Sequence, residues 1–365
     1  MIPTVPTSSS RIIVALSGGV DSAVAALLLV RAGHDVQGLY MHNWEDDDGY
    51  CTTAQDFQDA RSVARELGIP LHSVDFSVQY RERVFARFLS EYRAGRTPNP
   101  DVLCNREIKF GDCLEHARRL GGDCIATGHY ARIAQLPDGP ALYKGVDAAK
   151  DQSYFLHAVR RGQFAHALMP LGELHKPRVR DIAREAGLPV FAKRDSTGIC
   201  FIGERPFREF LAQHLKATPG AIETPTGQHL GEHEGLPFYT LGQRGGIHLG
   251  GVSGFEEAPW YVAGKDAARN VLVVVQGADH PALYCRSVRA AELNWLVPPP
   301  PGAFDAAVRL RYRQADQAAR LEMTSDVCVR LLPAVPQRAV TPGQSAVFYD
   351  GERCLGGGVI TETDI

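Results

Sequence analysis

Residues 17–22, Ser-Gly-Gly-Val-Asp-Ser, join a short apolar run at 11–16 to a stretch at 22–31 that is apolar on nearly every face. This order predicts a buried strand, a glycine turn and a helix. Glycine lets the backbone approach an anion closely, and a helix N-terminus adds unpaired N–H groups and partial positive charge. The segment therefore predicts a phosphate-binding loop. The alternative is an ordinary strand–helix turn in which Asp21 or Ser22 only caps the helix.

The first third of the chain alternates strand and helix patterns. Strands are expected at 11–16, 36–40, 71–76 and 124–127, and helices at 22–31, 54–67, 84–92 and 108–120. Such alternation is typical of an α/β domain with a parallel sheet covered by helices on both faces. Ligands bind at the carboxyl ends of the strands in such a sheet.

The pattern changes after about residue 205. Glycine, proline and histidine are frequent between 219 and 254, and short apolar runs follow at 271–276, 307–312, 318–323, 327–332, 346–349 and 356–360. Six short runs separated by turn residues predict a small β-barrel. We therefore expect a catalytic domain at 1–205, a small central domain at 206–283 and a C-terminal β-barrel at 284–365.

Composition excludes several classes of protein. The first ten residues, MIPTVPTSSS, lack the apolar region of a signal peptide, and no run is long enough to span a bilayer. We expect a cytoplasmic protein with no membrane contact. The eight cysteines contain no Cys-x-x-Cys pair, so neither a zinc site nor any other metal site is expected. The acidic residues 46–48 are interpreted as a solvated loop.

A stiff loop at 95–105 carries Asp101 and Cys104 three residues apart. Two prolines disfavour helix before them, so Cys104 is expected in a loop just ahead of a helix that begins near Ile108. A cysteine close to a helix N-terminus, beside Arg106 and Lys109, should have a lowered pKa and act as a nucleophile. The alternative is a rigid turn with a capping Asp101 and a buried thiol.

A second cysteine, Cys200, lies in the segment 195–203 after the basic pair Lys193-Arg194. Taken alone, it fits a buried cysteine in a short apolar strand. Taken with Cys104, it indicates sulfur chemistry, because one thiol can carry a persulfide that the other attacks.

The six-residue loop resembles the signature of the PP-loop ATP pyrophosphatases, which cleave ATP between the α and β phosphates. Longer segments resemble the bacterial tRNA-specific 2-thiouridylase family, among them MHNWEDDDGYC, GRTPNPDVLCNREIKF, ATGHYAR, KDQSYFL, KRDSTGICFIGER, TLGQR and TPGQSAVFYDGE. One departure is Gly245, where that family often has a lysine after TLGQR.

The resemblance implies ATP-dependent 2-thiolation of the wobble uridine, position 34, of tRNA, with Mg²⁺ accompanying ATP. It implies that Cys104 is the nucleophile, that Cys200 bears the persulfide, and that Asp101 is a general base or a base-positioning group. It implies ATP contacts at Ala15, Leu16, Ser17, Gly18, Gly19, Val20, Asp21, Ser22, Met41 and Gly128. It implies target-base contacts at Asn99, Pro100 and Asp101, and tRNA contacts at His129, Lys150, Asp151, Gln152, Arg311, Tyr312 and Gln344. The implied partners are tRNAs of the Lys, Glu and Gln type and a sulfur-relay protein that loads Cys200.

Two other classes of function share the glycine loop. An amidating ligase would need an ammonia source, and no glutaminase signature is present. A tRNA-binding protein with a relic ATP loop would not need the pair Cys104 and Cys200. Whether Cys104 frees sulfide from the persulfide or closes a disulfide with Cys200 stays open at this stage.

Overall fold

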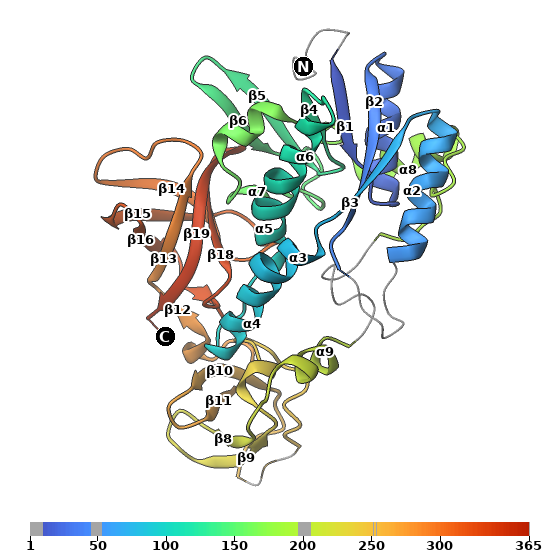
Figure 1. Cartoon of the computed structure of the whole chain (residues 1–365). Helices are drawn as coiled ribbons and strands as arrows, with labels where there is room; N and C mark the ends of the chain where they lie inside the picture. The colour runs from blue at the N-terminus through green and yellow to red at the C-terminus, as the bar shows by residue number, and fades with distance from the viewer. Residues whose placement is uncertain (1–9, 45–52, 196–205, 251, 253, 365) are drawn as a thin grey trace.

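The computed structural model describes residues 10–44, 53–195, 206–250, 252 and 254–364 of the 365-residue chain. Figure 1 shows three bodies: a helix-covered sheet from the N-terminal residues, a barrel from the C-terminal residues, and a smaller β domain below both. The predicted α/β class with a C-terminal barrel is confirmed.

The first domain is built on a parallel sheet of order β3-β2-β1-β4-β7. Its strands are β1 (Arg11–Ala15), β2 (Asp35–His42), β3 (Leu71–Asp75), β4 (Cys124–Ala126) and β7 (Ala167–Leu168). The four predicted strands are confirmed, and β7, with two residues, was not predicted. The chain runs outward from β1 to β3 and then returns to β4 on the other side of β1. The strand order therefore reverses between β1 and β4, which is where ligands bind in open sheets of this kind.

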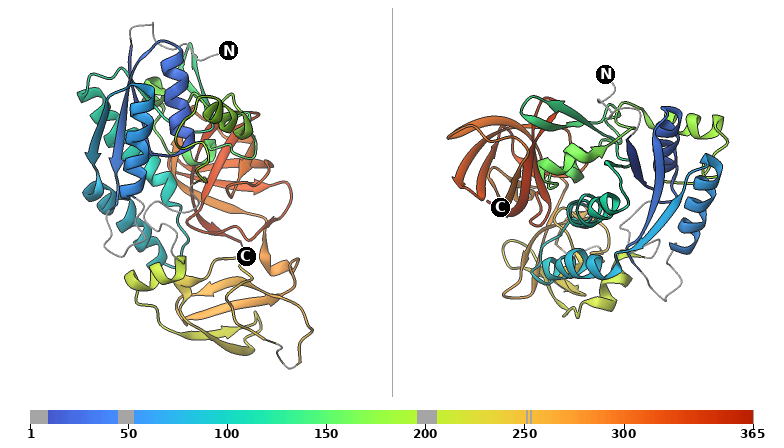
Figure 2. Two further views of the ribbon diagram at one scale, coloured as in Figure 1. Left: turned by 90° about the vertical axis from the view of Figure 1, so that its right-hand side faces the viewer. Right: turned by 45° about the horizontal axis from the view of Figure 1, so that its top comes forward.

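Helices cover both faces of this sheet (Figure 2). One layer holds α1 (Val20–Arg31), α2 (Thr53–Leu67) and α8 (Lys176–Glu185). The other holds α3 (Ser77–Tyr80), η1 (Arg81–Phe85), α4 (Ala86–Arg93), α5 (Pro100–Leu103), η2 (Cys104–Asp112) and α6 (Cys113–Arg119). Successive residues of β1 point to opposite layers: Ile12 packs in the cluster of α1 and α8, and Ile13 in that of α4 and η2.

The helix that carries Cys104 begins earlier than predicted. We expected it near Ile108, but it starts at Pro100 and runs through the wider-turn (π) segment η2 to Arg119. Pro100 takes the first helical position, where its missing N–H costs nothing, and the Asn99 side chain accepts a 3.2 Å hydrogen bond from the Asp101 amide. Cys104 is therefore a helical residue and not a loop residue.

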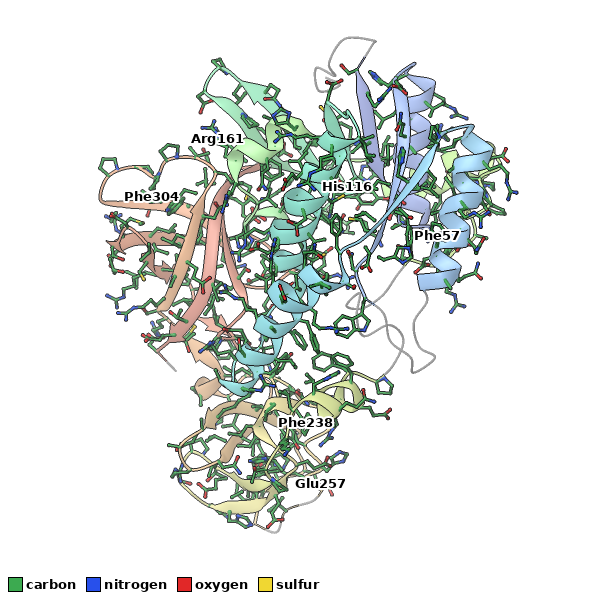
Figure 3. All side chains as sticks on the ribbon, in the orientation of Figure 1. Phe57, His116, Arg161, Phe238, Glu257 and Phe304 are labelled. Carbon is green, nitrogen blue, oxygen red and sulfur yellow. The ribbon has the colours of Figure 1, made fainter. Side chains whose placement is uncertain are left out.

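The central domain is a four-stranded sheet of order β10-β11-β8-β9 that follows α9 (Phe207–His214). Its strands are β8 (Gly220–Glu223), β9 (His229–His233), β10 (Trp260–Asp266) and β11 (Val271–Gln276). The run 271–276 was predicted as a barrel strand, which is wrong, because β11 pairs with β10 and β8. A short β-branched run fits either sheet equally well. Phe238, labelled in Figure 3, faces α9, where Arg208 stacks over its ring at 5.3 Å.

The barrel is a sheet of order β13-β16-β15-β14-β18-β19 that closes through the pair β13–β19. Its strands are β13 (Val288–Trp295), β14 (Ala303–Arg309), β15 (Gln317–Ser325), β16 (Cys328–Pro333), β18 (Ser345–Asp350) and β19 (Arg353–Thr363). A hairpin of the first domain, β5 (Ala131–Leu136) and β6 (Gly139–Lys144), extends this sheet beyond β19. The remaining elements are α7 (Ser153–Leu156), η3 (Arg161–His166), η4 (Leu236–Phe238), η5 (Pro281–Leu283), β12 (Tyr284–Cys285) and β17 (Gln337–Arg338).

Candidate active site

The glycine loop follows β1 and leads into α1, as predicted. The Ser22 hydroxyl donates to the Gly19 carbonyl at 3.1 Å and accepts from the Ser17 amide at 3.2 Å. In the part of the chain that the structure describes, no side chain caps the first turn of α1. Neither Asp21 nor Ser22 is thus a helix cap, and the N-terminal amides of α1 are left to face an anion.

Two glycines allow the backbone to pack closely around this loop. Gly18 has φ of 75°, and a Cβ there would lie 2.2 Å from the Asp56 carbonyl oxygen. Gly128, just after β4, packs against the start of α1, and its Cβ would lie 2.8 Å from the Ser22 nitrogen. Both positions require glycine, because any side chain would displace the loop.

Lys176, the first residue of α8, was not predicted as a site residue. Its ammonium group lies 2.7 Å and 2.8 Å from the two carboxylate oxygens of Asp21 and is almost fully buried. The Tyr130 hydroxyl donates to the same carboxylate at 2.8 Å. A lysine before a proline at a helix start is a common pattern, so the sequence offered little signal for it.

The Asp195 carboxylate lies beside the ion pair of Lys176 and Asp21 and contacts three cationic side chains. Lys150 and Lys176 each lie 2.7 Å from its carboxylate, and Arg180 lies at 2.5 Å. Burial opposes ionisation, but the hydrogen bonds from Lys150 and Lys176 outweigh it and lower the pKa of Asp195 to about 2. The start of α8 and Asp195 are thereby tied to the glycine loop.

Lys193 holds the other side of the glycine loop. Its ammonium group donates to the Gly18 carbonyl at 3.1 Å and pairs with Asp56 at 2.7 Å and Asp59 at 2.5 Å. Lys193, one of the two basic residues ahead of Cys200, therefore connects α2 to the glycine loop. Cys200 itself, in 196–205, lies outside the described residues, as does the acidic run 46–48.

Asp101 and Cys104 lie near the start of their helix, where Asp101 is partly buried and Cys104 is buried. Burial raises the pKa of Asp101 above its usual range, and the charge of Lys109 offsets only part of this effect. Cys104 is 2% exposed. The next residue, Asn105, donates to the Phe155 carbonyl at 3.2 Å, and the Phe155 ring packs on Tyr312 of the barrel with centroids 4.3 Å apart. The barrel residue Tyr312 thus reaches the neighbourhood of Cys104.

The segment Gly128-His129 connects the glycine loop to the cysteine helix. Gly128 packs on the start of α1, while the His129 ring lies 5.9 Å from the ring of Phe110 in η2. His129 also shares a 2.8 Å hydrogen bond with the Thr127 hydroxyl, and burial lowers its pKa well below the usual value. The predicted nucleotide loop and the predicted nucleophile helix therefore meet at the carboxyl end of β4.

The residues expected to contact tRNA occupy different environments. Asp151 is 2% exposed and pairs with Arg309 of the barrel at 2.6 Å, whereas Lys150 is partly exposed. The Gln152 side chain accepts from the Tyr130 amide at 3.0 Å. Arg311 donates to the carbonyl oxygens of Leu241 and Ala339. Their contacts with tRNA stay predictions.

Gln344 lies at a junction of the barrel and the first domain. Its side-chain nitrogen donates to the Thr97 carbonyl at 2.7 Å, and the Thr97 amide donates to the Pro342 carbonyl at 2.9 Å. The barrel turn at residues 342–344 thus holds the chain just ahead of Asn99 by hydrogen bonds. Met41, expected to contact ATP, is the penultimate residue of β2 and packs a partly buried side chain against the core.

The described residues contain no group of three or more His, Cys, Asp or Glu arranged to hold a metal ion. They also contain no helix with the length and apolar character needed to cross a membrane.

Family models match the chain along most of its length. A model described as the tRNA methyl transferase HUP domain matches residues 10–204, and one described as the tRNA methyl transferase PRC-barrel domain matches 208–276. A third, described as the Aminomethyltransferase beta-barrel domain, matches 285–360.

Named relatives align over almost the whole chain. The tRNA-specific 2-thiouridylase MnmA of Methylibium petroleiphilum is 55% identical over 388 residues, covering 96% of this chain and 98% of that protein. This chain belongs to the MnmA family of tRNA-specific 2-thiouridylases. The MnmA of Bordetella pertussis is likewise 55% identical over 370 residues, covering 98% of this chain and 100% of its own.

Solved structures resemble parts of this MnmA-family chain. A 4-thiouridine synthetase–RNA complex with bound ATP has a TM-score of 0.36 and 17% identity, covering 56% of this chain and 50% of that one. The U34-tRNA thiolase NcsA from Methanococcus maripaludis has a TM-score of 0.34 and 18% identity, covering 56% and 64%.

Proposed function

We propose that this protein is a tRNA-uridine 2-sulfurtransferase that uses ATP to convert the wobble uridine of tRNA, position 34, to 2-thiouridine. Membership of the MnmA family supports the reaction class. The single observation that carries the proposal is the junction at Gly128-His129, where the glycine loop and the helix of Asp101 and Cys104 come together. A site that activates an oxygen with ATP and then replaces it with sulfur needs both elements side by side.

The first half-reaction is adenylation. The triphosphate lies against Ser17–Ser22 and the amides of α1, and Lys176 neutralises Asp21 beside it. The C2 oxygen of the uridine attacks the α-phosphorus, a P–O bond forms, and pyrophosphate leaves. Mg²⁺ would be held by the ATP phosphates, and when bound it would supply charge neutralisation for the pyrophosphate that leaves. Asp101, whose pKa is raised by burial, serves as a general base or holds the uridine in place.

The second half-reaction replaces the activated oxygen with sulfur. Cys200 carries the persulfide, and a sulfur-relay protein loads it. In one order, the Cys104 thiolate attacks the Cys200 sulfur, the two cysteines form a disulfide, and the freed hydrosulfide displaces AMP from C2. In the other, the terminal persulfide sulfur displaces AMP first, and Cys104 then attacks Cys200 and releases 2-thiouridine. Both orders leave a disulfide that an external thiol must reduce.

Mass analysis of tRNA tests this proposal. Transcripts of the Lys, Glu and Gln type are incubated with the enzyme, ATP, Mg²⁺ and either a persulfide donor or free sulfide. Wild type should add one sulfur and lose one oxygen at U34. Cys104→Ser should fail with a persulfide donor, and Cys200→Ser should fail with a persulfide donor and recover with free sulfide. A wild-type enzyme that releases no pyrophosphate and thiolates none of the three tRNAs would reject the proposal.

The same assay separates the two other classes of function. A protein that only binds tRNA would release no pyrophosphate when tRNA is added. An amidating ligase would release pyrophosphate but incorporate no sulfur label. Pyrophosphate release that depends on tRNA, together with a sulfur-labelled product, is the result expected here.

A further inference from the structure

The central domain touches the chain immediately ahead of the catalytic helix. The ammonium group of Lys265, in β10, donates a hydrogen bond to the Gly95 carbonyl at 3.1 Å. Gly95 lies two residues after the end of α4 and has φ of 76°, and four residues later Asn99 caps the helix that carries Asp101 and Cys104. We call residues 95–99 the target-base loop, because they lead directly into the residues proposed to hold the uridine.

The target-base loop is held from three domains. Arg96 forms a two-point ion pair with Glu91 of α4, with both contacts at 2.6 Å. The barrel holds the Thr97 carbonyl through Gln344 at 2.7 Å. From the central domain come Lys265 and the Thr240 hydroxyl, which lies 3.3 Å from that of Thr97. Since the helix from Pro100 to Arg119 continues rigidly from this loop, the position of the loop fixes the position of Asp101 and Cys104.

Lys265 makes this contact at a cost in stability. Among the residues that the structure describes, the Gly95 carbonyl is the acceptor recorded for its ammonium group, and no carboxylate pairs with it. The neighbouring Asp266 is paired with Arg269 at 2.7 Å instead. Burial lowers the pKa of Lys265 to about 8, so its charge is disfavoured in the folded protein. A partly buried ammonium that faces a neutral carbonyl is poorly compensated, which argues against stability as the reason for the residue.

We propose that Lys265 is a positioning residue for thiolation: by holding the Gly95 carbonyl, the central domain sets the target-base loop so that Asp101 and Cys104 meet the uridine. This inference rests on the proposed function. It gives the central domain a part in the chemical step, beyond any part in docking tRNA. Deletion of the contact should therefore reduce turnover more than tRNA affinity.

The test compares Lys265→Met, which keeps the length of the side chain but removes the charge and the donor, with Lys265→Arg, which keeps both. Arg269→Met is the matched control, because Arg269 is an exposed cation of the same domain whose recorded ion pairs, with Asp266 and Glu223, lie within that domain. In Lys265→Met, kcat for tRNA thiolation should fall about 10–100-fold, with KM for tRNA changed less than about 3-fold. Its melting temperature should equal or exceed that of wild type. Lys265→Arg should regain most of kcat, and Arg269→Met should match wild type.

Hydrogen exchange supplies a readout that does not depend on catalysis. Amides of residues 96–103 should exchange faster in Lys265→Met and at the wild-type rate in Arg269→Met. Unchanged kcat, or a raised KM with unchanged kcat, would overturn the inference. So would lost activity with a lower melting temperature and unchanged exchange in 96–103, which would mark a structural residue. If wild type thiolates no tRNA, the proposed function fails, while the exchange experiment still reports on the contact.

Discussion

The ammonium group of Lys176 lies 2.7 Å from one carboxylate oxygen of Asp21 and 2.8 Å from the other. Asp21 is in the first turn of α1, so an unneutralised carboxylate there would repel the phosphates that we propose bind to the glycine loop. Helix α8 therefore supplies a buried positive charge to a loop that is more than 150 residues away in sequence. The same ammonium pairs with Asp195, which couples the loop to the segment leading toward Cys200.

Substitution of Lys176 should weaken ATP binding. In Lys176→Met, the charge of Asp21 is no longer neutralised, and we expect the Kd for ATP to rise about 10–100-fold, equivalent to about 1.4–2.8 kcal/mol. Titration calorimetry with ATP and Mg²⁺ measures the change. Lys176→Arg should keep most of the affinity, and Lys216→Met, at an exposed lysine, should leave it unchanged. Wild-type affinity in Lys176→Met would contradict this role.

A methyl group at Gly128 should displace the glycine loop. The added Cβ would lie 2.8 Å from backbone atoms of Asp21 and Ser22, which cannot move aside as a flexible side chain can. We expect Gly128→Ala to lower the free energy of unfolding by about 1–3 kcal/mol and to impair ATP binding. Gly162→Ala is the control, because a Cβ there meets no atom within 4 Å. Equal thermal stability and ATP affinity in the two variants would show that the loop tolerates the shift.

Asp101→Asn should separate stability from catalysis. Because the pKa of Asp101 is raised above 3.8 in the folded protein, the folded state binds its proton more tightly than the unfolded state does. This contribution to stability is complete below pH 3.8 and is lost as pH rises through the folded-state pKa. The variant should therefore be at least as stable as wild type at pH 7, while thiolation falls about 10²–10⁴-fold. Thermal unfolding from pH 4 to 7 and single-turnover thiolation measure the two effects. The stability prediction is refuted if Asp101→Asn is less stable than wild type by an amount that grows as pH rises.

We expect the Asp151 carboxylate to stabilise the folded protein. Its carboxylate is buried against Arg309 of the barrel, and removal of one member of a buried pair costs about 3 kcal/mol or more. Asp151→Asn should unfold at a lower temperature. Asp138→Asn, which breaks an exposed pair with Arg161, should leave the melting temperature close to that of wild type. If Asp151→Asn keeps its melting temperature but loses tRNA affinity, the carboxylate contacts tRNA directly.

The parts of the fold that carry regular patterns could be predicted from the sequence. Strand β1 and the glycine turn after it combine a short apolar run with residues of unusual backbone freedom, so their position could be predicted directly. Strand β13 was missed because its alternation is interrupted: the pairing shifts register between Ala291 and Asn294, and Glu292 has φ of 51°. Strand β7 has two residues, too few for any periodicity.

In the candidate site too, residues in local motifs could be predicted from the sequence, and residues that act on distant partners could not. Motif positions such as Ser17–Ser22 were predicted because their chemistry is local. Lys176 and Lys265 were missed because each acts on a carboxylate or carbonyl far along the chain, and only the folded arrangement brings the partners together. Cys104 was placed in a loop because Pro98 and Pro100 were taken as helix breakers, whereas Pro100 begins the helix.

The hairpin β5–β6 belongs to the nucleotide domain by sequence and to the barrel by hydrogen bonding. Its Lys144 amide donates to the Glu352 carbonyl at 2.9 Å, and Arg132 pairs with Glu352 at 2.7 Å. The C-terminal barrel is therefore not a module that can be separated from the first domain. A chimera that takes its barrel from another MnmA would also have to take residues 131–144 from that protein. Otherwise β6 of one protein would have to pair with β19 of the other.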